Sequence, residues 1–147
     1  MSWEQVQFSI PGKPKGIYII TDEVLRSVPQ IKEFEVGILH LFIKHTSAAL
    51  TINENWDSAV LTDVASTLDR LVPKDVYYEH EQQGEGKNDA MSHSQSVLVG
   101  PSLSIPIKNG RLALGTWQGI YLCEFRVERL SRTIIATING KKKQGCA

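Results

Sequence analysis

The chain has 147 residues, enough for one domain with a hydrophobic core that folds by itself. Its 16 basic and 16 acidic side chains give a net charge of zero, which excludes the positive surface expected of a general nucleic-acid binder. No apolar run approaches the roughly 18 residues of a membrane span, no signal-peptide pattern is present, and two cysteines are too few for a disulfide framework. We therefore expect a cytoplasmic protein without nucleic-acid or membrane partners.

The N-terminal part predicts two strands and a short helix. Polar and apolar side chains alternate over residues 3–10, and residues 16–20 form a second short strand after a proline- and glycine-containing turn. We expect these two strands to pair as a hairpin. Thr21 or Asp22 then caps a short helix, which Pro29 ends.

The stretch 37–57 is the most informative part of the sequence. It begins with an apolar run that predicts a strand covered on both faces. Side chains alternate along a strand, so His45 falls at the end of the row formed by Leu39, Leu41 and Ile43. Hydroxyl, amide and carboxylate groups follow. A functional site at the end of a rigid strand fits this pattern. It is equally explained if the histidine is simply hydrogen-bonded at the strand boundary and the Asn/Asp cluster is a helix N-cap.

Two helices and a polar loop follow this stretch. Residues 56–71 carry an apolar stripe at helical spacing that ends with Leu71. Residues 77–93 are polar and show neither helical nor strand periodicity, which predicts a loop. Loops of this length are often functional. A helix over about 89–99, closed by Gly100, would place Asp89 and His93 on one face because they are four residues apart.

The C-terminal third predicts β structure. Asn109-Gly110 is the signature of a two-residue type I′ hairpin, whose strands we expect to pair as far as residues 103 and 116. Strands are also predicted at 117–127 and 132–138. Glu124 is interpreted as a salt-bridge partner of an arginine, such as Arg126 or Arg132. We expect a single compact α+β domain over residues 1–140, with mixed or antiparallel sheets and about three helices, and a frayed basic tail over 141–147.

Several segments resemble the signatures of one family. They are KGIYIITDEV at 15–24, HTSA with LTINEN at 45–55, the histidine-containing positions 78–80 and 92–93, Glu85-Gly86, and GTWQGI at 115–120. The chain resembles, to about residue 140, the YjbQ-like family of small, little-characterised proteins, sometimes labelled secondary thiamine-phosphate synthases. Gln95 stands where bacterial members carry a lysine, which removes a group that would meet a phosphate.

The resemblance implies a compact YjbQ-like fold, a homotrimer, and a site near His45, His80 and His93. It also implies a weak thiamine phosphate synthase activity, which joins a pyrimidine pyrophosphate to a thiazole phosphate and releases pyrophosphate. The expected ligand is a small phosphorylated or anionic molecule.

Three hypotheses for this site stay open. In the first, His45, His80 and His93 hold zinc or a similar divalent metal and leave a position free for water or substrate. In the second, no metal is resident, a histidine moves protons, and magnesium arrives with a pyrophosphate substrate. In the third, the chain is a non-catalytic homotrimeric module that binds a small anion or metal, and its three tryptophans lie in subunit contacts or in the core.

The candidate residues follow from these hypotheses. The candidate catalytic residues are His45, His93 and Glu54. The candidate substrate-binding residues are Thr46, Ser47, Asn53, Glu85, Asp89, Thr116, Trp117 and Gln118.

Overall fold

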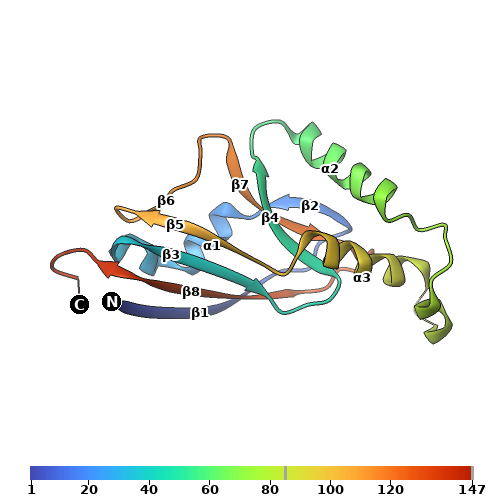
Figure 1. The fold of residues 1–147 in the computed structure, drawn as a ribbon, viewed down its shortest axis with the longest axis horizontal. Helices are drawn as coiled ribbons and strands as arrows, with labels where there is room; N and C mark the ends of the chain where they lie inside the picture. Colours follow the sequence, from blue (N-terminus) through green and yellow to red (C-terminus); the bar gives the residue numbers. More distant parts are fainter. Residues whose placement is uncertain (85, 147) are drawn as a thin grey trace.

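The computed structural model describes residues 1–84 and 86–146 of the chain. These residues form eight β-strands, three α-helices and two short 3₁₀-helices, η1 and η2 (Figure 1). In chain order they are β1 Ser2–Ile10, β2 Gly16–Ile19, α1 Thr21–Ser27, η1 Pro29–Glu33, β3 Phe34–Ile43, β4 Ala48–Glu54, α2 Ser58–Leu71, η2 Glu79–Gln83, α3 Lys87–Val99, β5 Ser102–Lys108, β6 Arg111–Leu112, β7 Gln118–Glu124 and β8 Arg132–Lys142. None of the helices in the described ranges is long and apolar enough to cross a membrane.

The strands form two sheets. The large sheet has the order β1-β8-β3-β5-β6, and the small sheet has the order β2-β7-β4. Every strand pairing in the described residues is antiparallel. The two ends of the chain lie side by side at one edge of the molecule, because Ser2 in β1 is opposite Gly140 in β8 (Figure 1).

The main hydrophobic core lies between the two sheets. Aliphatic side chains such as Leu41 and Ile138 of the large sheet and Ile120 of the small sheet are fully buried there, together with residues of α1 and η1. A smaller core lies between the small sheet and α2, where Tyr121 packs with Leu68. The layers are therefore the large sheet, the small sheet and α2, with α3 at one end of the molecule (Figure 1). The predicted α+β class and single domain are confirmed.

The predicted hairpin between the first two strands is wrong. β1 pairs with β8 and β2 pairs with β7, so the two strands belong to different sheets. The connecting segment contains Pro11 and Pro14, which have no backbone N–H to continue a strand ladder. It carries the chain from one sheet to the other.

The prediction that the central strand is covered on both faces is also wrong for the single chain. Leu39, Leu41 and Ile43 are buried, but Ile38 and Phe42 on the opposite face of β3 are 51% and 42% exposed. Together with Trp3 and Val36, Ile38 and Phe42 form an apolar patch on the outer face of the large sheet, which no other described element covers.

The helices begin and end close to the predicted residues. Asp57 is the N-cap of α2, and its carboxylate accepts a hydrogen bond from the Ala59 N–H at 2.9 Å. Leu68 packs on the small sheet as predicted, whereas Leu71, the last residue of the helix, is 65% exposed. α3 begins at Lys87, slightly earlier than predicted, and ends before Gly100 as expected.

The start of α1 differs from the prediction. Neither Thr21 nor Asp22 is the N-cap, because Ile20 takes that position without a side-chain hydrogen bond. The Thr21 hydroxyl oxygen instead accepts a hydrogen bond from the Ile120 N–H at 2.9 Å. This contact joins α1 to the small sheet.

The C-terminal hairpin is confirmed at its turn and corrected in its length. Asn109 and Gly110 have φ of 50° and 77°, which is the type I′ conformation. The pairing ends at Leu112 rather than near residue 116, and Pro106 has no N–H to extend it. At the other end of the domain, β8 continues through Lys142, so residues 141 and 142 belong to the large sheet rather than to a frayed tail.

The close approach of β3 and β8 predicts a sensitive glycine. A Cβ atom on Gly140 would lie 2.7 Å from the Gly37 Cα, and it would also press on the Val36 carbonyl oxygen. We expect Gly140→Ala to lower the free energy of unfolding by about 1–3 kcal/mol in urea titrations. Gly115→Ala is the control, because the nearest atom there is on the flexible Gln118 side chain at 3.3 Å. Equal effects of the two substitutions would contradict this account.

Candidate functional site

Three side chains with metal-ligating atoms meet beside α3 and η2. His80 lies on η2, and Asp89 and His93 lie one turn apart on α3, which confirms their predicted common face. His80 Nε2 is 2.7 Å and His93 Nε2 is 3.3 Å from the same atom, Asp89 Oδ2. Their ligand atoms all lie within 4.8 Å of one another. We call these three residues the histidine–aspartate cluster.

The hydrogen bonds of His93 determine which of its ring nitrogens carries hydrogen. His93 Nδ1 lies 2.9 Å from the backbone carbonyl oxygen of Thr46. A carbonyl oxygen only accepts, so Nδ1 carries the hydrogen and donates it. In the neutral ring, Nε2 then presents a lone pair to the carboxylate of Asp89. This arrangement is favourable only with a cation between them, either a proton on Nε2 or a metal ion.

Asp89 is the centre of the cluster. Its side chain is 4% exposed, and its Oδ1 accepts a hydrogen bond from Arg126 Nη1 at 2.6 Å. Burial alone would raise the pKa of Asp89, but the hydrogen bond from His80 and the positive charges of His93 and Arg126 hold the pKa below its ordinary value. The carboxylate is therefore ionised at neutral pH.

His45 does not belong to the histidine–aspartate cluster. Its Nε2 accepts a hydrogen bond from the backbone N–H of Thr133 at 2.7 Å, so in the neutral ring Nδ1 carries the hydrogen. Burial lowers the pKa of His45, and the positive charges of Arg132 and Lys44 lower it further, against an opposing effect of Glu124. At neutral pH the side chain is thus an uncharged N–H donor.

An open cavity of about 480 Å³ brings His45 and His93 together. Ser96 of α3 also lines it, and the Ser96 hydroxyl oxygen is buried with no hydrogen-bond partner among the described residues. A buried polar atom without a partner is uncommon in proteins. The cavity therefore combines a neutral imidazole, a cluster histidine and an unpaired hydroxyl.

A buried ion pair holds the turn that carries His45 and Thr46. Glu124 and Arg132 are 1% and 2% exposed, and Arg132 donates to both carboxylate oxygens of Glu124, from Nε at 2.6 Å and from Nη2. Arg132 Nη2 also donates to the carbonyl oxygen of Ser47 at 3.2 Å and to its hydroxyl oxygen at 3.0 Å. The salt-bridge interpretation of Glu124 is confirmed with Arg132. The hydroxyl of Ser47, a candidate substrate-binding group, is only 5% exposed and binds this arginine.

Five candidate residues lie far from this cluster in the single chain. Ala48 is opposite Glu124 at one end of β4, and Glu54 is opposite Gln118 at the other end. Six residue steps along a strand span about 20 Å. The structure therefore separates the predicted site into two groups, and the distant group contains Asn53, Glu54, Thr116, Trp117 and Gln118.

Local contacts account for the polar groups at this far end. The Asn53 side chain accepts a hydrogen bond from the Glu54 N–H at 2.7 Å, and Gln118 Oε1 accepts one from the Gly115 N–H at 2.8 Å. Trp56 and Trp117 contact edge to face at 5.5 Å between ring centroids, and they are 77% and 56% exposed. Trp3 is 71% exposed, so the core interpretation of the tryptophans is wrong.

Two further residues complete the comparison with the sequence. The candidate Glu85 lies outside the described residues. The role of Arg126 as a partner of Asp89 was not predicted, because the two residues are 37 positions apart and no periodic pattern connects them. The four-residue spacing of Asp89 and His93 predicted their common face, whereas His80 was placed at the site only by the family resemblance.

Comparisons with known proteins extend over nearly the whole chain. A model of the family described as UPF0047 protein YjbQ-like matches residues 5–141. The chain is 43% identical over 139 residues to the UPF0047 protein YjbQ of Salmonella typhimurium, covering 95% of this chain and 99% of that protein. It is 38% identical over 130 residues to a UPF0047 protein of Methanocaldococcus jannaschii, covering 88% and 90% of the two chains.

Solved structures share the fold. A crystal structure of an uncharacterised conserved protein of the YjbQ/UPF0047 family from Clostridium acetobutylicum has a TM-score of 0.79 and 34% identity, covering 91% of this chain and 99% of that chain. A YjbQ-like protein of unknown function from Sulfolobus solfataricus has a TM-score of 0.84 at 24% identity, covering 95% and 99%. At that identity the second likeness shows the fold alone.

The environment of His45 predicts a specific pH dependence. The unfolded chain protonates this residue near pH 6.5, whereas the folded protein does so only at lower pH. The free energy of unfolding should therefore decrease as the pH falls from about 6.5 towards the folded pKa, and His45→Gln should remove that part of the decrease. Ring resonances of His45 in an NMR titration measure the pKa directly. A midpoint at or above 6.5 would show that this account is wrong.

Proposed function

The chain belongs to the UPF0047 (YjbQ-like) family, and we propose that it binds a divalent transition metal such as zinc at the histidine–aspartate cluster. We further propose that it uses this metal on a small anionic ligand. The observation that supports this is the hydrogen bond from His93 Nδ1 to the Thr46 carbonyl, which leaves Nε2 facing Asp89 Oδ2 at 3.3 Å. Metal-ligating histidines commonly donate their other N–H to a carbonyl in this way.

The side chains present fit such an ion. Two imidazole nitrogens and one carboxylate oxygen are ligands that zinc takes, and three protein ligands leave one position for water or substrate. We therefore replace His45 by Asp89 in the ligand set predicted from the sequence. Arg126 balances the charge of Asp89 from the side away from the histidines, through Oδ1. When bound, the metal would supply Lewis-acid activation of a ligand or water.

The remaining groups of the cavity suit ligand binding. The neutral His45 offers its Nδ1–H, and Ser96 offers an unpaired buried hydroxyl. Both groups can donate a hydrogen bond to an anionic oxygen without carrying charge. We infer that His45 positions the ligand or delivers a proton to it, which keeps it as a candidate catalytic residue beside His93.

Thiamine phosphate synthase activity is the most specific form of this proposal. Its pyrophosphate substrate brings magnesium, and Thr116 and Gln118 were expected to hold phosphate oxygens. Within one chain these residues lie at the other end of the small sheet, so they would reach the cluster only from a second copy. Gln95 is buried and donates to Asp69 Oδ1 of α2 at 2.9 Å, the oxygen that also accepts from Lys15 Nζ, so this side chain is bound within the protein and contributes no cation to a phosphate site. Formation of thiamine phosphate from the two precursors, lost in His93→Asn, would support this activity.

The alternative function is a non-catalytic homotrimeric module that binds a metal or small anion. Zinc binding without turnover of phosphorylated substrates would favour it. We propose the homotrimer for either function, because the apolar patch on the outer face of the large sheet needs a cover and the net charge of zero does not oppose self-association.

Zinc binding can be measured directly. We expect about one zinc ion per chain by elemental analysis after gel filtration of protein prepared without a histidine tag or chelator. His93→Asn should weaken zinc binding by on the order of 100-fold or more. The control is His40→Asn, since His40 lies on the outer face of the large sheet with Nδ1 3.0 Å from the Ser104 hydroxyl. No zinc in the parent protein, or equal zinc in both variants, would refute the metal site.

The oligomer is tested by light scattering. We expect a mass of three times the 16.4 kDa chain that does not change with concentration. Phe42→Glu, in the apolar patch, should reduce this mass because it places a charge in the proposed contact. Leu71→Glu, at the more exposed end of α2, should leave it unchanged. A monomeric parent protein contradicts the proposal.

A further inference from the structure

A large cavity lies away from the histidine–aspartate cluster, between α1 with η1 on one side and the β5–β6 hairpin on the other. Its volume is about 800 Å³, within the range of small-molecule sites. Its lining includes the residues Thr21, Leu25, Lys32, Arg111, Leu112 and Leu114. None of these residues belongs to the cluster or to its cavity, so this is a separate place on the molecule.

The cavity exists because the hairpin is short. β6 ends at Leu112, and after one more backbone hydrogen bond, from the Ala113 N–H to the Pro106 carbonyl oxygen at 2.8 Å, the chain leaves the sheet. At the other end, Gly110 packs tightly, since a Cβ there would lie 2.8 Å from the Lys32 carbonyl oxygen. The hairpin tip therefore contacts η1, while the segment after β6 stands apart from α1 and leaves a space between them.

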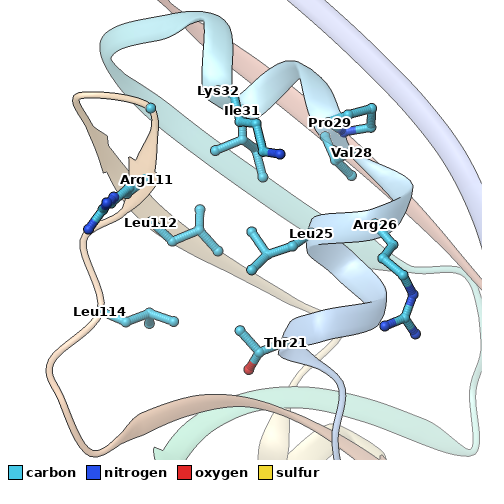
Figure 2. Close-up of a pocket in the computed structure, with 11 residues that line it drawn as sticks. Thr21, Leu25, Arg26, Val28, Pro29, Ile31, Lys32, Arg111, Leu112 and Leu114 are labelled. Atoms are coloured by element: carbon cyan, nitrogen blue, oxygen red, sulfur yellow. The ribbon is translucent and has the colours of Figure 1, made fainter.

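The walls of this space are apolar. Figure 2 shows Leu25 of α1 pointing toward Leu112 and Leu114 across the cavity. Leu25 is 40% exposed although it belongs to a helix whose neighbour Val24 is fully buried. An apolar ligand body would remove this leucine surface from water, which is a favourable change.

The rim of the cavity is positively charged. Arg26, Lys32 and Arg111 are its charged lining residues in the described part of the chain, where no acidic side chain lines it. Glu23 Oε1 lies 3.8 Å from Arg26 Nη2 and partly balances that cation, so Lys32 and Arg111 are the cations that a ligand would meet. Figure 2 shows Arg111 and Arg26 on opposite flanks of the leucines. The Lys143 ammonium adds a further positive charge at the hairpin tip, where it lies next to Gly110. In a chain with no net charge, this is a local concentration of cations.

We propose that this cavity binds an amphipathic small molecule with an aliphatic or aromatic body and one anionic head group, a carboxylate or a phosphate. The body would lie against Leu25, Leu112 and Leu114, and the head would contact Lys32 and Arg111. The Thr21 hydroxyl oxygen accepts the Ile120 N–H, so its own hydrogen can be donated into the cavity.

A two-fold contact with a second copy fits this place less well, whereas a homotrimer contact would join this face to a different surface and is distinguished by the test below. A two-fold contact through this face would bring the same cations of both copies together. Like charges across an interface disfavour association. The charge of the rim therefore selects a small anion rather than another copy of this surface.

Isothermal titration with decanoate below its micelle concentration tests the proposal, with decyl phosphate and decanol as parallel probes. We expect saturable binding of one or both anions and binding of decanol on the order of tenfold weaker. The double variant Lys32→Glu/Arg111→Glu should weaken anion binding on the order of tenfold or more, and so should Leu25→Asp, which places a carboxylate in the apolar wall. Arg70→Glu is the control for charge reversal away from the cavity, because it replaces one cation by an anion on the exposed side of α2, as each substitution of the double variant does at the rim.

The site is independent of the proposed metal, so His93→Asn should bind decanoate as the parent does. Equal binding of decanol and decanoate, or unchanged binding in the double variant, would overturn the anion assignment. The absence of saturable binding together with a smaller light-scattering mass of Leu25→Asp would show that a second copy covers the cavity instead.

Discussion

The candidate site depends on the buried ion pair between Glu124 and Arg132. This pair connects the end of β7 in the small sheet to the start of β8 in the large sheet. Arg132 also donates to Ser47, which lies in the turn between β3 and β4, so this turn is held beside the ion pair. Burying such a pair adds little to stability, but removing one partner costs about 3–5 kcal/mol, because a charge is left without compensation. Its contribution is thus the geometry of the turn on which His45 and the Thr46 carbonyl lie.

The position of this turn determines the hydrogen bonds of both histidines, and these bonds set the chemistry that each side chain can perform. The Thr46 carbonyl orients His93, the Thr133 N–H orients His45, and the two histidines receive opposite roles. His93 directs Nε2 to the Asp89 carboxylate at 3.3 Å and is suited to share a cation with it. His45 presents an N–H and is suited to donate to a ligand. Two histidines with different hydrogen-bond partners thus offer different chemistry to a bound ligand, as the proposed function requires.

The surfaces that the single chain leaves uncovered have different characters. The outer face of the large sheet combines Trp3, Ile38 and Phe42 in an apolar patch, which suits contact with another copy. The cavity beside α1 is apolar within and positively charged at its rim, which suits a small anion. The exposed pair of Trp56 and Trp117 lies beyond the end of β4 that is opposite the turn carrying His45. The arrangement of the chains in a trimer would determine whether that end of the small sheet lies near the histidine–aspartate cluster of a neighbouring chain.

The sequence by itself determined the features that depend on residues close together along the chain. The alternation over β1, the Asn109-Gly110 turn and the common face of Asp89 and His93 were predicted because each rests on local backbone geometry. Only the tertiary structure decided that β1 pairs with β8, that Asp89 binds Arg126, and that Glu54 lies apart from His45. The pairings of β1 with β8 and of Asp89 with Arg126 join residues 37 or more positions apart, and their choice depends on how two whole sheets pack around one core. Glu54 lies apart from His45 because the extended strand β4 lies between them. No periodic pattern within a single segment carries that information.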